Sequence, residues 1–417
     1  MTATPNRISD VVACNLCTGC GACAGLFPNA IRMIEDELAG RRPVVANEDA
    51  DTAAMAVCAG AAVEKPAVKD AIDDEWGPVR ATWEGYAADT EIHFRGSSGG
   101  AVTALAQFAL EQGFVSGVAH VAASKTDARV NEAVISRDRA GLVRGSGSRY
   151  AQASPAELLR EIAASDTPMA FIGKPCDIAS AHKAAQQSPG LAQNLGLTIG
   201  IFCAGAPNLN ATTRLLDHLD VPRDVKVTDL RYRGNGWPGL MQATYETATG
   251  EEITTRGIPY SEGWGTILQT GRGWRCRICD DHTAAFADIS VGDPWHNPPK
   301  GNTDAGRSLI IARTKRGEEL IRAAIAAGVL VAEEKSRDVI ALAQPNLVAT
   351  NAAVWGRRKA MQLVGMPVPQ GQIGASFGRW LRLSAKERAQ SFAGTLKRIW
   401  RNKLWRPVKI SGVEAAQ

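Results

Sequence analysis

The stretch Cys14-Asn-Leu-Cys17-Thr-Gly-Cys20-Gly-Ala-Cys23 places four cysteines at intervals of three residues near the start of the chain. In a tight loop with interspersed glycines, successive thiolates can converge on one centre while backbone N–H groups point at the sulfurs. So dense a run predicts metal or redox chemistry rather than thiols that lie together incidentally. We therefore predict a small, loop-rich cluster domain over residues 1–65.

The spacing is that of a bacterial ferredoxin cluster loop, in which a further cysteine stands just before a proline. Here Phe27 occupies that position, and Cys58 is the only other cysteine within the first 175 residues. Cys14 then becomes a spare or alternate ligand. A zinc site is the alternative, although zinc motifs usually pair two CxxC units across a longer spacer or add histidines. We predict a ferredoxin-like domain with one 4Fe–4S cluster on Cys17, Cys20, Cys23 and Cys58.

The other four cysteines are spread over a hundred residues. Cys176 and Cys203 each follow a short apolar run, Ala170-Phe-Ile and Ile199-Gly-Ile-Phe, which predicts a buried strand that stops at a turn. Sites in α/β sheets are built at the carboxyl ends of strands. A zinc site or ordinary buried thiols remain as alternatives. The pattern predicts a second 4Fe–4S cluster on Cys176, Cys203, Cys276 and Cys279.

Two glycine-rich loops form candidate phosphate sites. Arg95-Gly-Ser-Ser-Gly-Gly100 opens a predicted helix over 101–110, and free N–H groups at a helix N-terminus favour an anion. Gly145-Ser-Gly-Ser-Arg-Tyr150 adds further N–H groups and Arg149, which could pair with a phosphate bidentately. Neither loop is a Walker or GxGxxG motif. Together they suit a dinucleotide such as FAD, whereas plain helix caps and surface turns are the alternative.

Taken in order, these motifs resemble the family of coenzyme F420 hydrogenase/dehydrogenase beta subunits, to which 7-hydroxymethyl chlorophyll a reductase is related. The resemblance spans roughly residues 14–345 and rests on the cysteine run, Ser97–Gly100, Gly147–Tyr150, Phe171–Cys176, Phe202–Cys203, Cys276–Cys279 and Ala287–Trp295. It implies FAD and one or two 4Fe–4S clusters. The implied cofactor-binding residues are Ser97, Ser98, Gly99, Gly100, Thr103, Gly147, Ser148, Arg149, Tyr150 and Lys174.

The same resemblance implies an iron–sulfur flavoprotein oxidoreductase. Such a protein passes electrons between a one-electron donor (ferredoxin) or coenzyme F420 and an organic substrate. The alternatives are an electron-transfer beta subunit of a larger hydrogenase or dehydrogenase complex, and a zinc-stabilised interaction protein. Lys174 and Asp177 depart from the Thr and Gln that are common in the family. Because they flank a predicted ligand, these departures leave the substrate open.

The chain ends in a basic segment. Of its net charge of +4, the segment from Arg379 to Ile410 carries +9, so the rest carries about −5. An apolar face runs along this segment at helical spacing, through Phe392, Leu396, Ile399, Trp400 and Leu404. We expect a helix that contacts a membrane surface or an acidic partner, or else one that packs on the body. No motif predicts nucleic-acid binding.

The 417 residues, 45% hydrophobic and 22% charged, predict an ordinary globular protein of two or three domains. No signal peptide and no apolar run of about 18 residues is present, so we expect a cytoplasmic protein, with peripheral contact at the inner face of the membrane as an option. The fold class is α+β (mixed α/β). A linker over 66–86 should lead to an FAD-binding and second-cluster α/β body over 87–345, with a strand near 117–122 and a helix near 317–327. A helical basic tail over 346–417 follows.

Three further residues carry weaker signals. Asp293 precedes Pro294 and reads as a turn residue, with a polar role near the flavin as the alternative. His282 follows the CxxC pair closely, and a solvated surface histidine is the favoured interpretation. Trp237 lies in a glycine-rich turn and either packs there or covers a substrate pocket.

Overall fold

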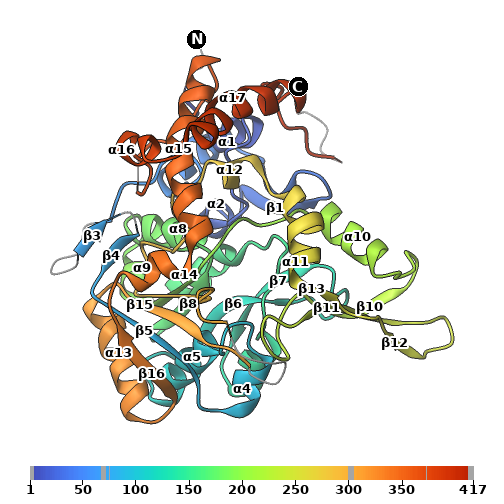
Figure 1. Ribbon diagram of the computed structural model, residues 1–417, viewed down its shortest axis with the longest axis vertical. Helices are drawn as coiled ribbons and strands as arrows, with labels where there is room; N and C mark the ends of the chain where they lie inside the picture. The colour runs from blue at the N-terminus through green and yellow to red at the C-terminus, as the bar shows by residue number, and fades with distance from the viewer. Residues whose placement is uncertain (1–3, 67–71, 75, 299–304, 372, 412–417) are drawn as a thin grey trace.

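The computed structural model describes residues 4–66, 72–74, 76–298, 305–371 and 373–411. At its centre lies an eight-stranded mixed sheet (Figure 1). Its strand order is β16 (Leu330–Lys335), β5 (Ala81–Ala87), β15 (Ser308–Ala312), β14 (Ile289–Gly292), β9 (Leu195–Ile201), β8 (Met169–Gly173), β6 (Val118–Ala123) and β7 (Asn131–Ser136). The middle strands β14, β9, β8 and β6 are parallel, and the pairs toward both edges are antiparallel. The carboxyl ends of the middle strands therefore meet at one edge of the sheet.

Helices cover both faces of this sheet. α5 (Ala101–Glu111) and α13 (Lys315–Ala326) pack on one face, and α7 (Leu159–Ala163), α8 (Pro175–Ala185) and α9 (Pro189–Asn194) belong to the other. Neighbouring residues of β8 alternate between the two cores, with Ala170 under α5 and α13 and Phe171 under α7 and α8. The predicted helices near 101–110 and 317–327 and the strand near 117–122 are confirmed.

A separate antiparallel ribbon projects from the body (Figure 1), formed by β10 (Lys226–Arg231), β11 (Leu240–Glu246), β12 (Glu252–Thr254) and β13 (Ile258–Pro259). Its apolar core includes buried leucines of α10 (Leu209–His218). The short connecting elements are α4 (Thr90–Arg95), α6 (Arg139–Arg144), η2 (Pro155–Leu158), α11 (Tyr260–Glu262), η3 (Gly263–Ile267), η4 (Leu268–Gly271) and α12 (Trp274–Arg277). Several of these connections line the candidate site described below.

The N-terminal region contains α1 (Ile8–Ala13), α2 (Ala22–Leu26), β1 (Ile31–Asp36), β2 (Gly40–Val45), α3 (Glu48–Ala53) and η1 (Ala54–Val57). β1 and β2 pair antiparallel, and α2 packs against α8 of the body. The expected linker over 66–86 is only partly confirmed. Part of it lies outside the described residues, β3 (Ile72–Asp74) pairs with β4 (Gly77–Val79), and β5 already enters the main sheet at Ala81. The body therefore begins before residue 87.

The C-terminal segment is helical, as predicted: α14 (Val339–Ala343), α15 (Pro345–Leu363), α16 (Phe377–Leu381) and α17 (Ala385–Arg401). α17 packs along α15, and Ile399 is buried with Val11 and Met361, so the tail docks on the body. Trp400, predicted on the same apolar face, is instead 77% exposed, because only a narrow stripe of the helix is covered. Among the described residues, no helix combines the length and hydropathy needed to cross a bilayer.

Candidate functional site: thiols beside a glycine-rich cavity

The parallel strands deliver polar residues to one edge of the sheet. β8 ends at Gly173 and is followed by Lys174 and Cys176, which begin α8. β9 ends at Ile201, two residues before Cys203, and pairs in parallel with β8. Asp293 follows β14 at the same edge. The predicted strand-end position of the two thiols is confirmed, and it follows from the topology of open α/β sheets.

The first cysteine run folds into a tight loop. Gly19 and Gly21 adopt φ of 73° and 90°, which side chains rarely tolerate. A Cβ on Gly21 would lie 2.8 Å from atoms of both Glu157 and Ser154. The Gly19 N–H donates to Cys17 Sγ at 3.4 Å, as expected for a loop whose amides face its sulfurs. The glycines therefore allow the cysteines to turn toward one another.

The four thiols predicted as the first ligand set lie together. Burial raises the pKa of Cys23 well above its ordinary value, and Cys20, Cys17 and Cys58 are near enough to raise it further. Burial likewise raises the pKa of Cys58 to about 12. Burial raises the pKa of Cys14 to about 11, and its Sγ donates to the carbonyl oxygen of Val11 at 3.6 Å. Cys14 packs against the same apolar cluster as Cys17 and Cys58, and its role as a spare or alternate ligand stays a prediction.

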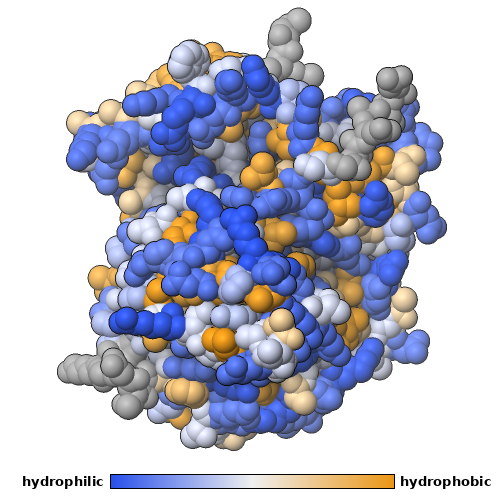
Figure 2. All heavy atoms as spheres, turned by 90° about the vertical axis from the view of Figure 1, so that its right-hand side faces the viewer, coloured by the Kyte–Doolittle hydropathy of each residue, from blue (hydrophilic) through white to orange (hydrophobic). Residues whose placement is uncertain are grey.

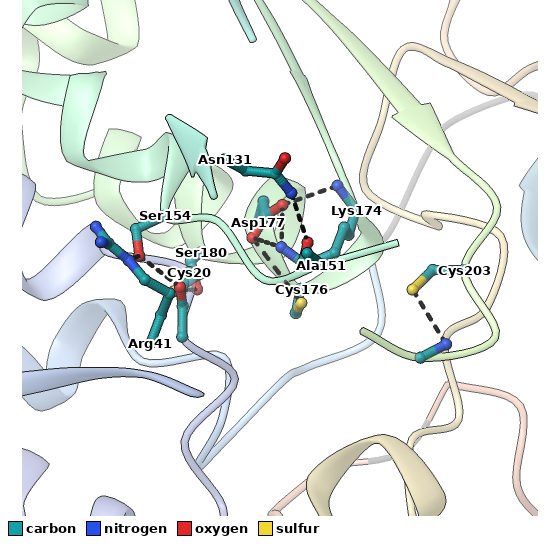
Figure 3. Close-up of polar contacts among 12 residues, drawn as sticks. Cys20, Arg41, Asn131, Ala151, Ser154, Lys174, Cys176, Asp177, Ser180 and Cys203 are labelled. Atoms are coloured by element: carbon teal, nitrogen blue, oxygen red, sulfur yellow. Dashed lines mark hydrogen bonds and ion pairs between the residues drawn. The ribbon is translucent and has the colours of Figure 1, made fainter. Parts of the chain in front are cut away.

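α8 joins this loop to the second thiol set. Cys20 and Ser180 lie side by side (Figure 3), and Cys20 Sγ donates to Ser180 Oγ at 3.3 Å. The Ala59 N–H donates to the same oxygen at 3.4 Å. Cys176, at the start of the same helix, lies near both Cys20 and Cys203, whose charges raise its pKa in addition to the effect of burial. The two sets are therefore adjacent, with Cys176 between them.

The second set surrounds a small cavity of about 40 Å³, here called the thiol cavity. The five cysteines in its wall are Cys17, Cys176, Cys203, Cys276 and Cys279. Burial raises the pKa of Cys203 to about 12 and that of Cys279 to about 11. The Gly205 N–H donates to Cys203 Sγ at 3.3 Å. In the described part of the chain, no three His, Cys, Asp or Glu side chains are arranged to hold a single metal ion.

His282 lies in the wall of the thiol cavity and is only 3% exposed. Its Nδ1 lies 2.8 Å from the carbonyl oxygen of Cys203, and its buried Nε2 has no hydrogen-bond partner. Burial lowers the pKa of the imidazole, which is therefore neutral at pH 7. The sequence-based interpretation of His282 as a surface histidine is wrong, because the chain after the CxxC pair turns inward beneath Cys203.

Cationic side chains surround these thiols. Lys174 Nζ contacts both carboxylate oxygens of Asp177 at 2.7 Å (Figure 3); Asp177 is buried and Lys174 is half-buried. Arg275 lines the thiol cavity and donates from Nε to the carbonyl oxygen of Gly60 at 3.0 Å, while its buried Nη1 has no partner. Arg42 lines the same cavity near Cys17. Buried positive charge next to thiols favours their anionic form.

A larger cavity of about 290 Å³, here called the glycine-loop cavity, lies at the carboxyl edge of the sheet. All of the predicted cofactor residues except Gly99 line it: Ser97, Ser98, Gly100, Thr103, Gly147, Ser148, Arg149, Tyr150 and Lys174. Gly99 has a φ of 65°, and a Cβ there would lie 2.9 Å from Arg307 Cα, so its role is to let the loop pass this backbone. Lys174 and Cys203 line both cavities.

An ion pair that the sequence did not reveal forms one wall of the glycine-loop cavity. Arg233, 2% exposed, contacts Asp293 through Nη2–Oδ1 at 2.6 Å and Nη1–Oδ2 at 2.7 Å. Ser98 Oγ and Trp237 Nε1 also donate to Asp293 Oδ1, at 2.6 and 2.8 Å. Burial alone would raise the pKa of Asp293, but Arg233 and these donors hold it below its ordinary value. Asp293 is thus the buried centre of a network rather than a turn residue.

Aromatic rings pack around this pair. The Arg233 guanidinium carbon lies 5.1 Å from the ring centroid of Tyr260 and 5.3 Å from that of Trp295. Tyr150 packs against Trp264, with 4.9 Å between ring centroids, and all four rings line the glycine-loop cavity. Tyr260 and Trp264 lie four residues apart in the continuous segment of α11 and η3, whereas Tyr150 and Trp295 come from distant segments that no local sequence signal could have grouped with them. The cavity therefore offers flat apolar surfaces opposite a glycine-rich loop.

Arg149 lines the glycine-loop cavity and is held by three protein acceptors. Its guanidinium donates to Asn131 Oδ1 at 2.8 Å and to the carbonyl oxygens of Leu230 and Ala128, both at 2.6 Å. Burial lowers the pKa of this group, and nearby Tyr232 offsets part of the effect. Each guanidinium nitrogen donates to one protein acceptor, while Nη1 and Nη2 each keep one further N–H, so the pairing of Arg149 with a phosphate stays a prediction. These bonds tie the second glycine loop to β10.

Similarity to known proteins follows the same segments. The models of the coenzyme F420 hydrogenase/dehydrogenase beta subunit match residues 82–160 for its N-terminal part and 166–338 for its C-terminal part. The beta subunit of the coenzyme F420 hydrogenase of Methanothermobacter thermautotrophicus is 27% identical over 251 residues, which cover 58% of this chain and 80% of that protein. One subunit of the F420H2 dehydrogenase of Methanosarcina mazei is 24% identical over 318 residues, which cover 76% and 84%.

A solved structure supports the fold. A chain of the F420-reducing NiFe hydrogenase complex from Methanosarcina barkeri superposes with a TM-score of 0.54 at 20% identity, over 72% of this chain and 98% of that chain. The first cysteine loop and the helices α15 to α17 lie outside the residues that the family models match. Within the matched residues lie both glycine loops and all four cysteines of the second set. The chain belongs to the family of coenzyme F420 hydrogenase/dehydrogenase beta subunits.

Proposed function

We propose that this chain is an iron–sulfur flavoprotein oxidoreductase. In this proposal it passes electrons between a one-electron donor such as ferredoxin, or coenzyme F420, and an organic substrate. The observation that carries the proposal is the shared wall of the two cavities, since Lys174 and Cys203 line both. A redox group held by the thiols would then lie next to a group held by the glycine loop.

The thiols suit two 4Fe–4S clusters, on Cys17, Cys20, Cys23 and Cys58 and on Cys176, Cys203, Cys276 and Cys279. Each thiolate of such a cluster binds its own iron, so the sulfurs stand farther apart than around one zinc ion. Within each set the thiols are near enough to raise one another's pKa, and among the described residues no group of three side chains suits a single metal ion. The cations Lys174, Arg42 and Arg275 would offset the negative charge of the ligated clusters.

The glycine-loop cavity suits FAD. The loop before α5 presents its N–H groups at a helix N-terminus, where a phosphate is favoured. Ser97 lines the cavity, and its buried Oγ has no hydrogen-bond partner, as expected of a group that awaits a ligand. The rings of Tyr150, Tyr260, Trp264 and Trp295 offer surfaces for a planar heterocycle.

When bound, a flavin would supply two-electron chemistry, while clusters carry one electron at a time. The protein itself would hold the flavin and the clusters at a defined distance from each other. It would also keep the Arg233–Asp293 pair rigid and exclude water from the thiol cavity. Lys174 places a positive charge at the boundary between the cavities. Its ion pair with Asp177 holds that ammonium group in place.

A second candidate function is that of an electron-transfer subunit. The relatives named above are subunits of a hydrogenase and of a dehydrogenase, and the solved chain belongs to a hydrogenase complex. In that case the chain would exchange electrons with coenzyme F420 and have no organic substrate of its own. The two candidate functions are distinguished by one measurement: whether the isolated chain turns over an organic substrate when a chemical electron donor is supplied.

The test is anaerobic purification followed by a UV–visible spectrum and by quantification of iron, sulfide, zinc and flavin. Two clusters and one FAD would give about eight irons and one flavin per chain. Cys203→Ser should lower the iron content, whereas Cys14→Ser, which removes a thiol outside both sets, should leave it unchanged. Zinc without iron or flavin would refute the proposal.

A further inference from the structure

Five arginines from three elements gather beside the second thiol set. They are Arg272, two residues before α12, Arg277 at the end of α12, Arg357 on α15, and Arg398 and Arg401 on α17, and are here called the arginine cluster. These three helices lie at the same end of the molecule (Figure 1). Arg357 Nη1 donates to the carbonyl oxygen of Arg277 at 2.6 Å, and Arg272 Nη1 donates to that of Ala204, next to Cys203, at 2.7 Å.

The arginine cluster has no acidic partner in the part of the chain that the structure describes. Its hydrogen bonds go to backbone carbonyls, to the hydroxyl of Thr395 and to the side chain of Asn402. Arg358, one residue along α15, does pair with a carboxylate, Asp280 Oδ1 at 2.6 Å. Burial and the nearby Arg398, Arg272 and Arg277 lower the pKa of Arg357 to about 10. The positive charges of the arginine cluster therefore repel one another, and no acidic side chain of the described residues neutralises them.

Exposed aromatic residues accompany this charge. Trp400, between Arg398 and Arg401 on α17, is 77% exposed, and Trp405 is 51% exposed. Figure 2 shows apolar side chains among hydrophilic ones on the upper part of one face of the molecule. Tryptophan and arginine are the residues most enriched at the energetic centres of protein interfaces. Arg277 and Arg357 are only partly exposed, so acidic side chains can approach them more closely than a flat lipid surface can.

We infer that the arginine cluster and Trp400 form the docking surface for a small acidic protein that carries one electron. The inference rests on the proposed function and adds to it the place where the electron enters. The docked carrier loses one electron and the chain gains one, most directly at the Cys276–Cys279 set that the cluster borders. No proton or chemical group is transferred at this surface. Opposite charges would steer the encounter and make its rate depend on salt.

The test measures the reduction of the full chain by a reduced plant-type 2Fe–2S ferredoxin, by anaerobic stopped flow. Arg398→Gln/Arg401→Gln should lower the second-order rate constant at low salt by about tenfold, because steering is worth 10- to 1,000-fold. The matched control, Lys125→Gln/Lys315→Gln, removes the same charge from exposed sites on the loop after β6 and on α13 and should leave the rate unchanged. Methyl viologen, a cationic dye, should reduce all three proteins at similar rates.

Calorimetric binding of oxidised ferredoxin provides a readout that needs no electron transfer. The inference is supported if the wild-type chain binds oxidised ferredoxin, if the Arg398→Gln/Arg401→Gln variant binds it more weakly, and if the Lys125→Gln/Lys315→Gln variant binds it as the wild type does. Equal rates and equal binding for both double variants overturn it, as does arginine-dependent binding confined to vesicles of anionic phospholipid or to inorganic phosphate. If the chain holds iron and flavin and methyl viologen reduces it but ferredoxin does not bind, only this inference fails. A chain without iron and flavin would refute the proposed function itself.

Discussion

Replacing Asp293 with Asn removes one charge from a buried ion pair and preserves the shape of the side chain. Asp293 Oδ1 accepts three hydrogen bonds, and Oδ2 accepts one from Arg233 Nη1 at 2.7 Å. An asparagine can retain the oxygen at the first position, but its NH2 group would then face the Arg233 N–H donor. Arg233 is 2% exposed and would lose its counter-charge. Breaking such a pair from one side costs about 3–5 kcal/mol.

The assay is urea unfolding followed by tryptophan fluorescence, because Trp237 and Trp295 pack beside the pair. With a slope near 3 kcal/mol per molar urea, Asp293→Asn should lower the midpoint by about 1–2 M with the slope unchanged. The matched control is Asp217→Asn, which breaks the bidentate pair with Arg223 at the surface and should leave the midpoint unchanged. Equal midpoints for the two variants would refute the reasoning.

Two further measurements check the same cause. Since Arg233 and the surrounding donors hold the pKa of Asp293 below its unfolded value, the carboxylate stabilises the fold above that value, about 3.9. The difference between wild type and Asp293→Asn should therefore be constant near neutral pH and shrink as the pH falls through the lowered pKa. Arg233→Met combined with Asp293→Asn should recover part of the lost stability, because no charge then remains buried without a partner.

The other predictions concern one cluster and two structural side chains. Arg149→Met should destabilise the chain by about 2–4 kcal/mol in urea, because it leaves buried carbonyl oxygens without donors; no shift would show that the loop does not depend on this side chain. Cys58→Ser should remove about half of the iron counted per chain, whereas Cys14→Ser should keep it all, and equal losses would contradict the ligand assignment. Ile399→Ala should cost about 2–4 kcal/mol, since its side chain is 4% exposed, whereas Trp400→Ala on the same helix should cost nothing measurable; similar shifts would mean that α17 does not pack as described.

Local pattern was sufficient for much of the fold. The apolar runs that end before Cys176 and Cys203 become β8 and β9, and the segment of helix-forming residues after the first glycine loop becomes α5. Their periodicity reflects burial on one face or on both, which the chain encodes within a few residues. The start of the body was placed too late, because β5 pairs with strands more than two hundred residues away and its own sequence does not show this.

Some features of the candidate site could likewise be predicted from the sequence, and others depend on the tertiary structure. The identity of the thiols, the glycine loops and the basic tail can be read from short stretches, because ligand spacing and backbone freedom are local properties. The partners of Arg233, Arg149 and His282 cannot, since each side chain binds groups that come from distant segments. Which cations lie beside the thiols, and which arginines face solvent without an acid, depends on how the sheet edge, α12, α15 and α17 pack together. Charge and burial at a site are properties of that packing, because they arise from every neighbour in space and not from the neighbours in the chain.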